Sequence, residues 1–319
     1  MHGPLEAPPE YETPLPNDPR GARAKMNAMA AILDEGIANV TDALRQSCLY
    51  ENTLIVVSSD NGGWIQLDHG GNNFPLRGGK TTDFEGGVRT AAFVSGGFLE
   101  QMAPNLLGSR SNLLMHLVDW YDTLIEVGTS ISTRITKQDH RESQDVPPVD
   151  SLNVWEALIS NDDITAVRTE VPLSFCSKEA ACDWPGGSGN AALISWPWKV
   201  INGTQVGLGF WQGPQFPNAS KKIPQPSTDY GCPEGCLFNI ETDPTEHQEV
   251  KEKHPEIFAR LWSRLLEIGQ GVYQTNYDGG AKTCLPVEEA YRRDKGFLAP
   301  RCVVEDEGQG QEAVVSIES

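Results

Sequence analysis

The chain has 319 residues, a formal net charge of −19, a hydrophobic content of 39% and eight tryptophans. This length allows one large core or a large and a small one, and the hydrophobic content excludes a wholly disordered protein. The charge argues against a nucleic-acid-binding surface, which needs clustered Lys and Arg, and no apolar run is long enough to cross a bilayer.

A loop and a long helix come first in chain order. Residues 1–20 hold six prolines, which predicts an extended loop because proline disfavours helices and central strands. In residues 22–46 apolar side chains recur at steps of three and four, the period of one helix face. They are Met26, Met29, Leu33, Ile37, Val40 and Leu44. The pattern predicts an amphipathic helix that leads into a strand, a unit typical of parallel sheets.

A buried strand then ends in a polar turn. Residues 53–58 are mostly apolar, and the chain breaks at residues 60–63, Asp-Asn-Gly-Gly. Asp60 and Asn61 offer a carboxylate and an amide oxygen, the ligands that Ca²⁺ or Mg²⁺ prefers. Lys80 could aim a positive charge at an anion held by that metal. Taken alone, the four turn residues are more typical of a plain hairpin turn than of a metal site.

The rest of the chain divides into two further units and a tail. Residues 88–94 and 113–118 are predicted strands, and residues 119–126 a helix with Asp119 as its N-cap. A surface connection at 129–150 and a short helix within 151–160 close a domain that we place at residues 1–165. Residues 166–302 are predicted to form a smaller unit with strands at 191–200 and 236–240 and a helix at 255–268. The acidic residues 303–319 are expected to be disordered.

Seven cysteines, six of them after residue 175, indicate disulfides in an oxidising compartment. Cys232 and Cys236 have roughly the spacing of a metal clip, but a matching second pair is missing, so zinc is not expected. Cys176 and Cys182 could pair with each other or with that first pair. Three glycosylation acceptors, at Asn39, Asn202 and Asn218, agree with a secretory route, although no signal peptide precedes them.

Several blocks of the sequence, in order, resemble the sulfatase family, and most closely its arylsulfatase B, I and J group. The N-terminal blocks are SSDNGG, GGNNFPLRGGK and EGGVR; WKVINGT, LFNIETDPTEHQEV and HPEIFARLWSRL follow towards the C-terminus. The resemblance implies an alkaline-phosphatase-like α/β fold, in which helices flank a mixed sheet that is partial here. A small C-terminal antiparallel sheet with a helix would complete it.

The same resemblance implies roles for four residues. Asp60 and Asn61 would be ligands of a divalent cation, expected to be Ca²⁺. Lys80 would contact the sulfate and the leaving oxygen, and His2 the sulfate. The substrate would be a sulfate ester, with a sulfated glycosaminoglycan as the candidate, and the full-length protein would be lysosomal or secreted.

Two parts of the family's active site are missing from these 319 residues. The sequence contains no Cys/Ser-x-Pro-x-Arg motif, from which sulfatases make their formylglycine nucleophile, and no N-terminal Asp-Asp pair. We therefore expect the chain to begin inside the sulfatase domain and to be inactive as written. The alternatives are a non-catalytic pseudoenzyme and, less favoured, a related metal-dependent phosphatase or phosphodiesterase, which would typically have metal-binding histidines around the site.

Overall fold

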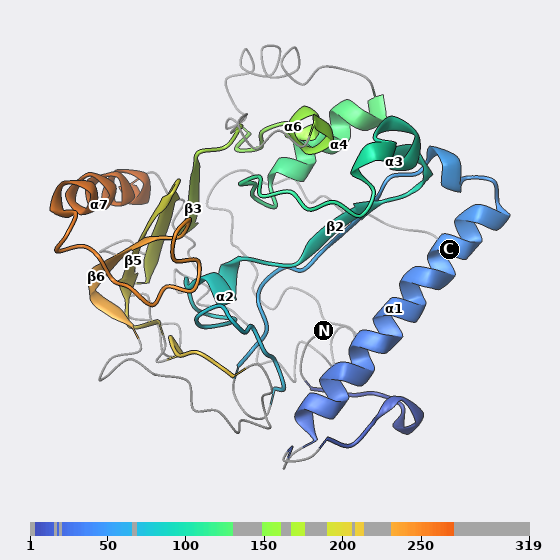
Figure 1. Cartoon of the computed structure of the whole chain (residues 1–319), viewed down its shortest axis with the longest axis horizontal. Coiled ribbons are helices and arrows are strands. Elements are labelled where there is room, and N and C mark those ends of the chain that lie inside the picture. Colours follow the sequence, from blue (N-terminus) through green and yellow to red (C-terminus); the bar gives the residue numbers. More distant parts are fainter. Residues whose placement is uncertain are drawn as a thin grey trace, which may run out of the picture. The chain divides into compact units, whose positions relative to one another are not determined.

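The structure is a computed structural model that describes residues 4–15, 18, 21–65, 69–129, 149–160, 167–175, 190–205, 208–213 and 231–270 (Figure 1). All of these residues belong to one compact unit, residues 1–272. The helices are α1 (Ala22–Gln46), α2 (Glu85–Val88), α3 (Gly97–Met102), α4 (Asp119–Thr129), α6 (Trp155–Ser160) and α7 (Pro255–Gln270), with 3-10 turns η1 (Pro9–Tyr11), η2 (Tyr50–Asn52) and η3 (Pro104–Leu106). No described helix is long and apolar enough to span a membrane.

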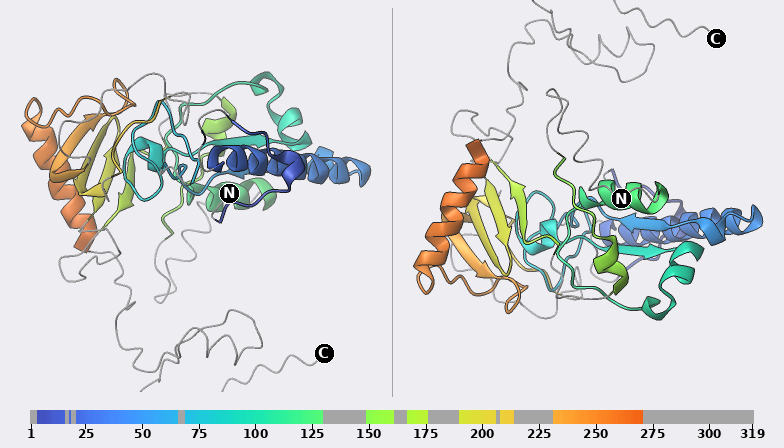
Figure 2. Two further views of the ribbon diagram at one scale, coloured as in Figure 1. Left: turned by 90° about the horizontal axis from the view of Figure 1, so that it is seen from below. Right: turned by 90° about the horizontal axis from the view of Figure 1, so that it is seen from above.

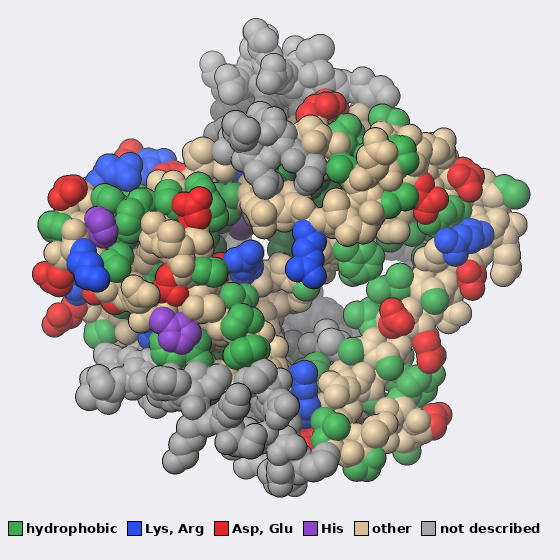
Figure 3. Space-filling view, in the orientation of Figure 1, with side chains coloured by type: hydrophobic (Ala, Val, Ile, Leu, Met, Phe, Trp, Pro, Cys, Tyr) green, Lys and Arg blue, Asp and Glu red, His purple; other side chains and the backbone are tan. Residues whose placement is uncertain are grey.

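The long helix α1 confirms the predicted helix and has the bounds that the spacing indicated. Its burial is confined to the first two turns, where Ala22, Ala24 and Ala28 are covered. Further along, Leu33 is 51% exposed and Val40 60% exposed. Figure 3 accordingly shows hydrophobic side chains on the surface over this helix. The apolar stripe is present, but the described residues cover only its N-terminal end.

The strand after α1 forms a small sheet. β1 (Ile55–Ser58) pairs with β2 (Ala92–Ser95) in an antiparallel register that joins Ile55 to Ser95 and Ser58 to Ala92. The prediction of a parallel α-then-β unit is therefore wrong for this pair. Part of the predicted strand 88–94 is also helical, because backbone bonds such as Arg89 N–H to the Glu85 carbonyl close α2 there.

Residues 113–118 were predicted to be a strand and are not one. A strand needs a neighbour for its ladder bonds, and within the described ranges this segment belongs to neither sheet. It ends in turns in which Asp119 N–H donates to the His116 carbonyl at 2.9 Å. The predicted helix follows as α4. Asp119 was predicted to be its N-cap, but its carboxylate accepts hydrogen bonds from the Arg168 side chain and from the Leu152 N–H, which lie outside the helix.

The C-terminal sheet is larger and antiparallel, as predicted. Its strands β3 (Glu170–Ser174), β4 (Ala191–Ser195), β5 (Trp198–Gly203) and β6 (Cys232–Asn239) lie in that order. The predicted strand 191–200 is in fact two strands. They are separated by a turn at Trp196-Pro197, because proline has no N–H for the ladder of a central strand.

Both faces of this sheet are covered (Figure 2). Helix α7 packs Leu261 and Leu265 against Leu193, Val200 and Leu237 on one face. The opposite face holds Phe84, which immediately precedes α2, in a cluster with Val171, Ala192, Ile194, Ile201 and Phe238. The strand periodicity of two explains this division, since neighbouring residues such as Val200 and Ile201 point to opposite faces.

The cysteines of β6 bond to each other, with 2.08 Å between the Cys232 and Cys236 sulfurs. This pairing agrees with the expectation that they hold no zinc. Cys48 is exposed and free. The predictions for His2, for Cys176 and Cys182, for Asn218 and for the tail 303–319 concern residues outside the described ranges.

Candidate active site

The turn that follows β1 carries Asp60 and Asn61 and is held by local hydrogen bonds. The Asn61 N–H donates to Asp60 Oδ1 at 2.8 Å, and the Ser59 hydroxyl donates to the Asn61 carbonyl at 2.8 Å. The Asn61 Nδ2 donates to the Gly62 carbonyl at 2.8 Å. This bond directs the amide nitrogen into the turn, so the Oδ1 is the atom through which Asn61 would ligate a cation.

Helix α2 packs directly against this turn through backbone alone. The Gly62 N–H donates to the Gly87 carbonyl at 2.8 Å. A Cβ on Gly62 would lie 1.7 Å from the Gly86 carbonyl oxygen. Glycine is therefore required at position 62 to let the two segments approach, and the position of α2 determines where the turn can lie.

A third segment brings Lys80 to the same place. The Lys80 N–H donates to the Gly63 carbonyl at 3.1 Å. Asn73 ties this loop to the turn, because its Oδ1 accepts from the Gly63 N–H at 2.9 Å and its Nδ2 donates to the Gly63 and Gly78 carbonyls. The Lys80 ammonium lies 5.8 Å from the centre of the Trp64 ring, which is within range of a cation–π interaction.

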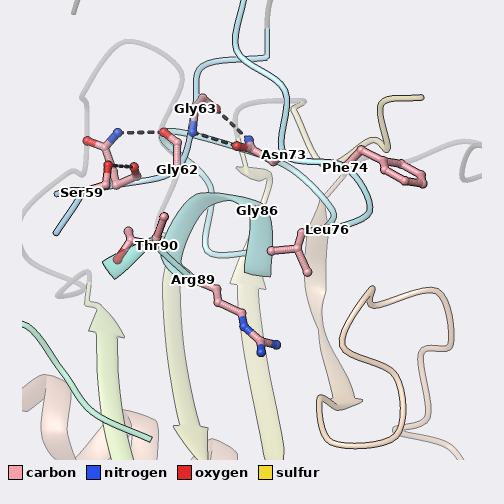
Figure 4. A pocket seen from close by; sticks show the side chains of 11 residues that line it. Ser59, Gly62, Gly63, Asn73, Phe74, Leu76, Gly86, Arg89 and Thr90 are labelled. Carbon is pink, nitrogen blue, oxygen red and sulfur yellow. Dashed lines mark hydrogen bonds between the residues drawn. The ribbon is translucent and has the colours of Figure 1, made fainter. Parts of the chain in front are cut away.

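The turn borders an open hollow of about 240 Å³ (Figure 4). Asn61, Gly63 and Asn73 line one part of it, and Arg89 and Thr90 line another. The Arg89 side chain is 55% exposed, and its guanidinium lies 3.9 Å from a Glu85 carboxylate oxygen. Of the two predicted cation ligands the hollow is therefore lined by Asn61 alone, and neither Asp60 nor Lys80 is among its lining residues.

The turn supplies only two side-chain oxygen groups of the kind that a hard divalent cation prefers. Asp60 is exposed and supplies one carboxylate, and Asn61 supplies one amide oxygen, whereas Ca²⁺ takes about six to eight oxygen ligands. Among the described residues no group of three or more His, Cys, Asp or Glu could hold a metal ion. The two ligands fit a hard divalent cation chemically but do not complete its shell.

A buried charged cluster lies behind the site, between α2 and the C-terminal sheet. The Lys199 Nζ, with no solvent exposure, lies 2.9 Å from Glu85 Oε1 and 2.9 Å from Glu246 Oε1. The Glu85 N–H donates to Glu246 Oε2 at 2.7 Å. Burial raises the pKa of Glu246 to about 7 although Lys199 opposes this change, and the two carboxylates raise the pKa of Lys199 against its burial.

The loop before α2 is fixed to the same C-terminal segments. The buried Arg77 donates its Nε–H to the Gly209 carbonyl at 2.8 Å, and its guanidinium lies 3.9 Å from the centre of the Phe84 ring. Asp83 accepts from Gln205 at 3.0 Å and from the Ser174 hydroxyl at 2.8 Å. Burial raises the pKa of the Asp83 carboxyl, and these two bonds oppose the rise.

Of the four predicted site residues, Asp60 and Asn61 lie in the turn and the Lys80 backbone bonds to Gly63 in that turn, but only Asn61 lines the hollow, and His2 lies outside the described residues. None of the four described histidines lines the hollow. Sequence reasoning missed Lys199 and Glu246. One signal was available for Lys199, because a lysine within the otherwise apolar run AALISWPWKV needs a buried partner.

The chain is similar in sequence to members of one known family. A profile of the Sulfatase family matches residues 1–129. Arylsulfatase J of mouse (Mus musculus) is 31% identical over 295 residues, which make up 87% of this chain and 45% of that protein. The chain therefore spans less than half the length of that relative.

Two solved structures share its fold. The structure of Ps i-CgsB in complex with k-i-k-neocarrahexaose has a TM-score of 0.56 and 23% identity, over 92% of this chain and 52% of that one. The PsFucS1 sulfatase from Pseudoalteromonas sp. has a TM-score of 0.51 and 19% identity, over 86% of this chain and 48% of that one. The family profile and the match to arylsulfatase J place residues 1–129 in the sulfatase family, and the two solved structures show that the chain shares their alkaline-phosphatase-like fold.

Proposed function

We propose that the protein is a metal-dependent sulfuric ester hydrolase and that these 319 residues supply part of its active site. The observation that carries the proposal is the meeting of three segments at the turn after β1. There Asp60 and Asn61 offer cation ligands, and the Lys80 backbone bonds to Gly63 within the same turn.

In this proposal Asp60 and Asn61 would hold a Ca²⁺ ion together with ligands from other residues. When bound, the cation would neutralise sulfate oxygens as a Lewis acid. Lys80 would place its ammonium against the sulfate ester and stabilise negative charge that develops on the leaving oxygen. The cation–π contact with the Trp64 ring would limit the positions that the Lys80 side chain can adopt.

The substrate class is proposed to be a sulfated sugar, as in a glycosaminoglycan. The match to arylsulfatase J supports a sulfate ester, and the neighbour solved with a bound oligosaccharide supports a sugar. A substrate of this kind would agree with a lysosomal or secreted location, which the disulfide between Cys232 and Cys236 also favours.

The first test is the sequence of the transcript upstream of Met1. We expect an in-frame segment with a Cys-x-Pro-x-Arg or Ser-x-Pro-x-Arg motif, and a transcript that lacks it would overturn the sulfatase proposal. The extended protein, produced in a host that forms formylglycine, is then assayed with an aryl sulfate with and without a Ca²⁺ chelator. We expect turnover that the chelator removes, and none from the 319-residue chain.

Variants test the assigned residues. Asp60→Asn and Lys80→Ala are expected to lower kcat of the extended protein by about 10²-fold or more. The exposed residues Asp34 and Lys253 provide matched controls, since Asp34→Asn and Lys253→Ala make the same changes away from the site. Equal activity in the site variants and their controls would contradict the assignment, and turnover by the 319-residue chain would show that its nucleophile had been overlooked.

A further inference from the structure

The cluster of Glu85, Lys199 and Glu246 connects the C-terminal sheet to the candidate site by a short route. Lys199 lies on β5 and, with Ile201, faces the side of the sheet that packs on Phe84. Its ammonium bonds the side chain of Glu85, the first residue of α2. Two residues later, the Gly87 carbonyl accepts the Gly62 N–H.

The residues along this route have little freedom to move. Lys199 has 0% side-chain exposure and Glu85 has 5%, so neither can exchange its partner for water. Glu246 holds Glu85 from a second direction, since its Oε2 accepts the Glu85 N–H. At the far end, the Gly86 carbonyl oxygen and Gly62 are in backbone contact with no side chain between them. A displacement of Glu85 must therefore be passed on to the turn that carries Asp60 and Asn61.

We propose that Lys199 is a positioning residue, which fixes the Asp60–Asn61 turn from the C-terminal sheet through Glu85 and α2. The role of that turn in binding a cation rests on the proposed function, whereas the mechanical link does not. The C-terminal sheet is then an integral part of the site even though none of its strand residues lines the hollow.

The link is tested by amide hydrogen exchange at Gly62 in the 319-residue chain. Lys199→Met removes the ammonium and keeps an unbranched apolar side chain. We expect Gly62 to exchange about tenfold faster, as loss of a buried hydrogen bond to a charged group implies. The matched control is Arg168→Met, which breaks another buried ion pair, with Asp119, that does not contact α2. Although this change lowers global stability, it should leave Gly62 exchange within about twofold of the parent under native conditions, in which Gly62 exchanges through local opening and not through global unfolding.

Unfolding must be separated from repositioning, because Lys199→Met leaves two buried carboxylates unpaired. The triple variant Glu85→Gln, Lys199→Met, Glu246→Gln removes all three charges together, and replacing a buried ion cluster in this way is often neutral for stability. Faster Gly62 exchange in the triple variant, with Gly62 unchanged in Arg168→Met, supports the link. Equal Gly62 exchange in the parent and the triple variant, or the same change in Arg168→Met, overturns it.

A second measurement separates this inference from the proposed function. In the extended protein the triple variant should bind Ca²⁺ about tenfold more weakly than the parent, as followed by the rise in unfolding temperature with added Ca²⁺. If the parent itself shows no such rise, the cation role of Asp60 and Asn61 fails, while the Gly62 exchange result still decides the mechanical link. If the parent binds Ca²⁺ and the triple variant binds it equally well, the positioning role fails.

Discussion

The two sheets of the structure differ in how completely they are covered. The four-stranded sheet has α7 on one face and the Phe84 cluster on the other. The β1–β2 pair has no buried residue in either strand, and Phe93 in β2 is 49% exposed. Helix α1 is likewise buried only near its start. Stability should therefore be concentrated in the C-terminal sheet and its contacts, although the candidate metal ligands follow β1.

The largest expected effect comes from the ion pair that joins α4 to the segment before β3. Arg168→Met leaves the fully buried Asp119 carboxylate without its cation, and breaking a buried pair in this way costs about 3–5 kcal/mol. The pair of Arg264 with Glu170 is 42% and 31% exposed, so Arg264→Met should cost less than about 1 kcal/mol. Urea unfolding of both variants measures the difference. Similar losses of unfolding free energy in the two variants would show that burial does not determine how much each ion pair stabilises the protein.

The next prediction compares a buried leucine of the C-terminal sheet with an exposed leucine of α1. Leu237 has 0% exposure, between Val200 and α7, so Leu237→Ala should lower the free energy of unfolding by about 2–5 kcal/mol. On α1, Leu33→Ala changes the same side chain at a position that is 51% exposed, and we expect a change within about 0.5 kcal/mol. If thermal and urea unfolding give Leu33→Ala the larger loss, then α1 is buried in solution by something beyond the described residues.

A smaller effect depends on pH. The folded state raises the pKa of Glu246 from 4.5 to about 7 by burial, so it holds this proton more tightly than the unfolded chain does. The stability due to that proton is fully present below about pH 4.5 and is lost as pH rises through about 7. The Lys199 ammonium and the Glu85 N–H contact the carboxyl, and the Arg77 guanidinium donates to the Glu246 backbone carbonyl at 3.4 Å.

Replacing this carboxyl tests the sign of the pH effect. Glu246→Gln, which cannot ionise, should flatten the fall in stability between pH 4.5 and 7 by on the order of 2 kcal/mol. The exposed Glu252 provides the control, since Glu252→Gln should leave the slope of the free energy of unfolding against pH unchanged. The prediction is wrong if the free energy of unfolding of the parent rises between pH 4.5 and 7 relative to that of Glu246→Gln.

The sequence predicted the elements whose signals are local. The period of apolar residues indicated α1 and α7, and the break after residue 58 indicated the end of β1. It failed where the outcome depends on distant partners. Residues 113–118 are apolar enough for a strand but join neither sheet in the described structure, and the direction of the β1–β2 pairing cannot be read from either strand alone.

The same division holds at the site. Asp60, Asn61 and Lys80 stand in short motifs, so their residue types and spacing were sufficient to predict them. Glu246 lies more than 150 residues from Glu85, in a turn whose sequence suggests no buried charge. Its role follows from tertiary packing alone, since Lys199, the cation that both glutamates share, is distant from each of them in the sequence.

The close contact of Gly62 with α2 also bears on how other members of this family would be recognised in uncharacterised sequences. Here Gly62 meets Gly86, and Gly79 would place a Cβ 2.4 Å from the Gly63 carbonyl oxygen. Such contacts tolerate neither a side chain nor a change in the length of the segments that bring the backbones together. The spacing between the glycine blocks should therefore persist even in a sequence that has lost its metal ligands, and would identify degenerate copies of the gene that a search for catalytic residues would miss.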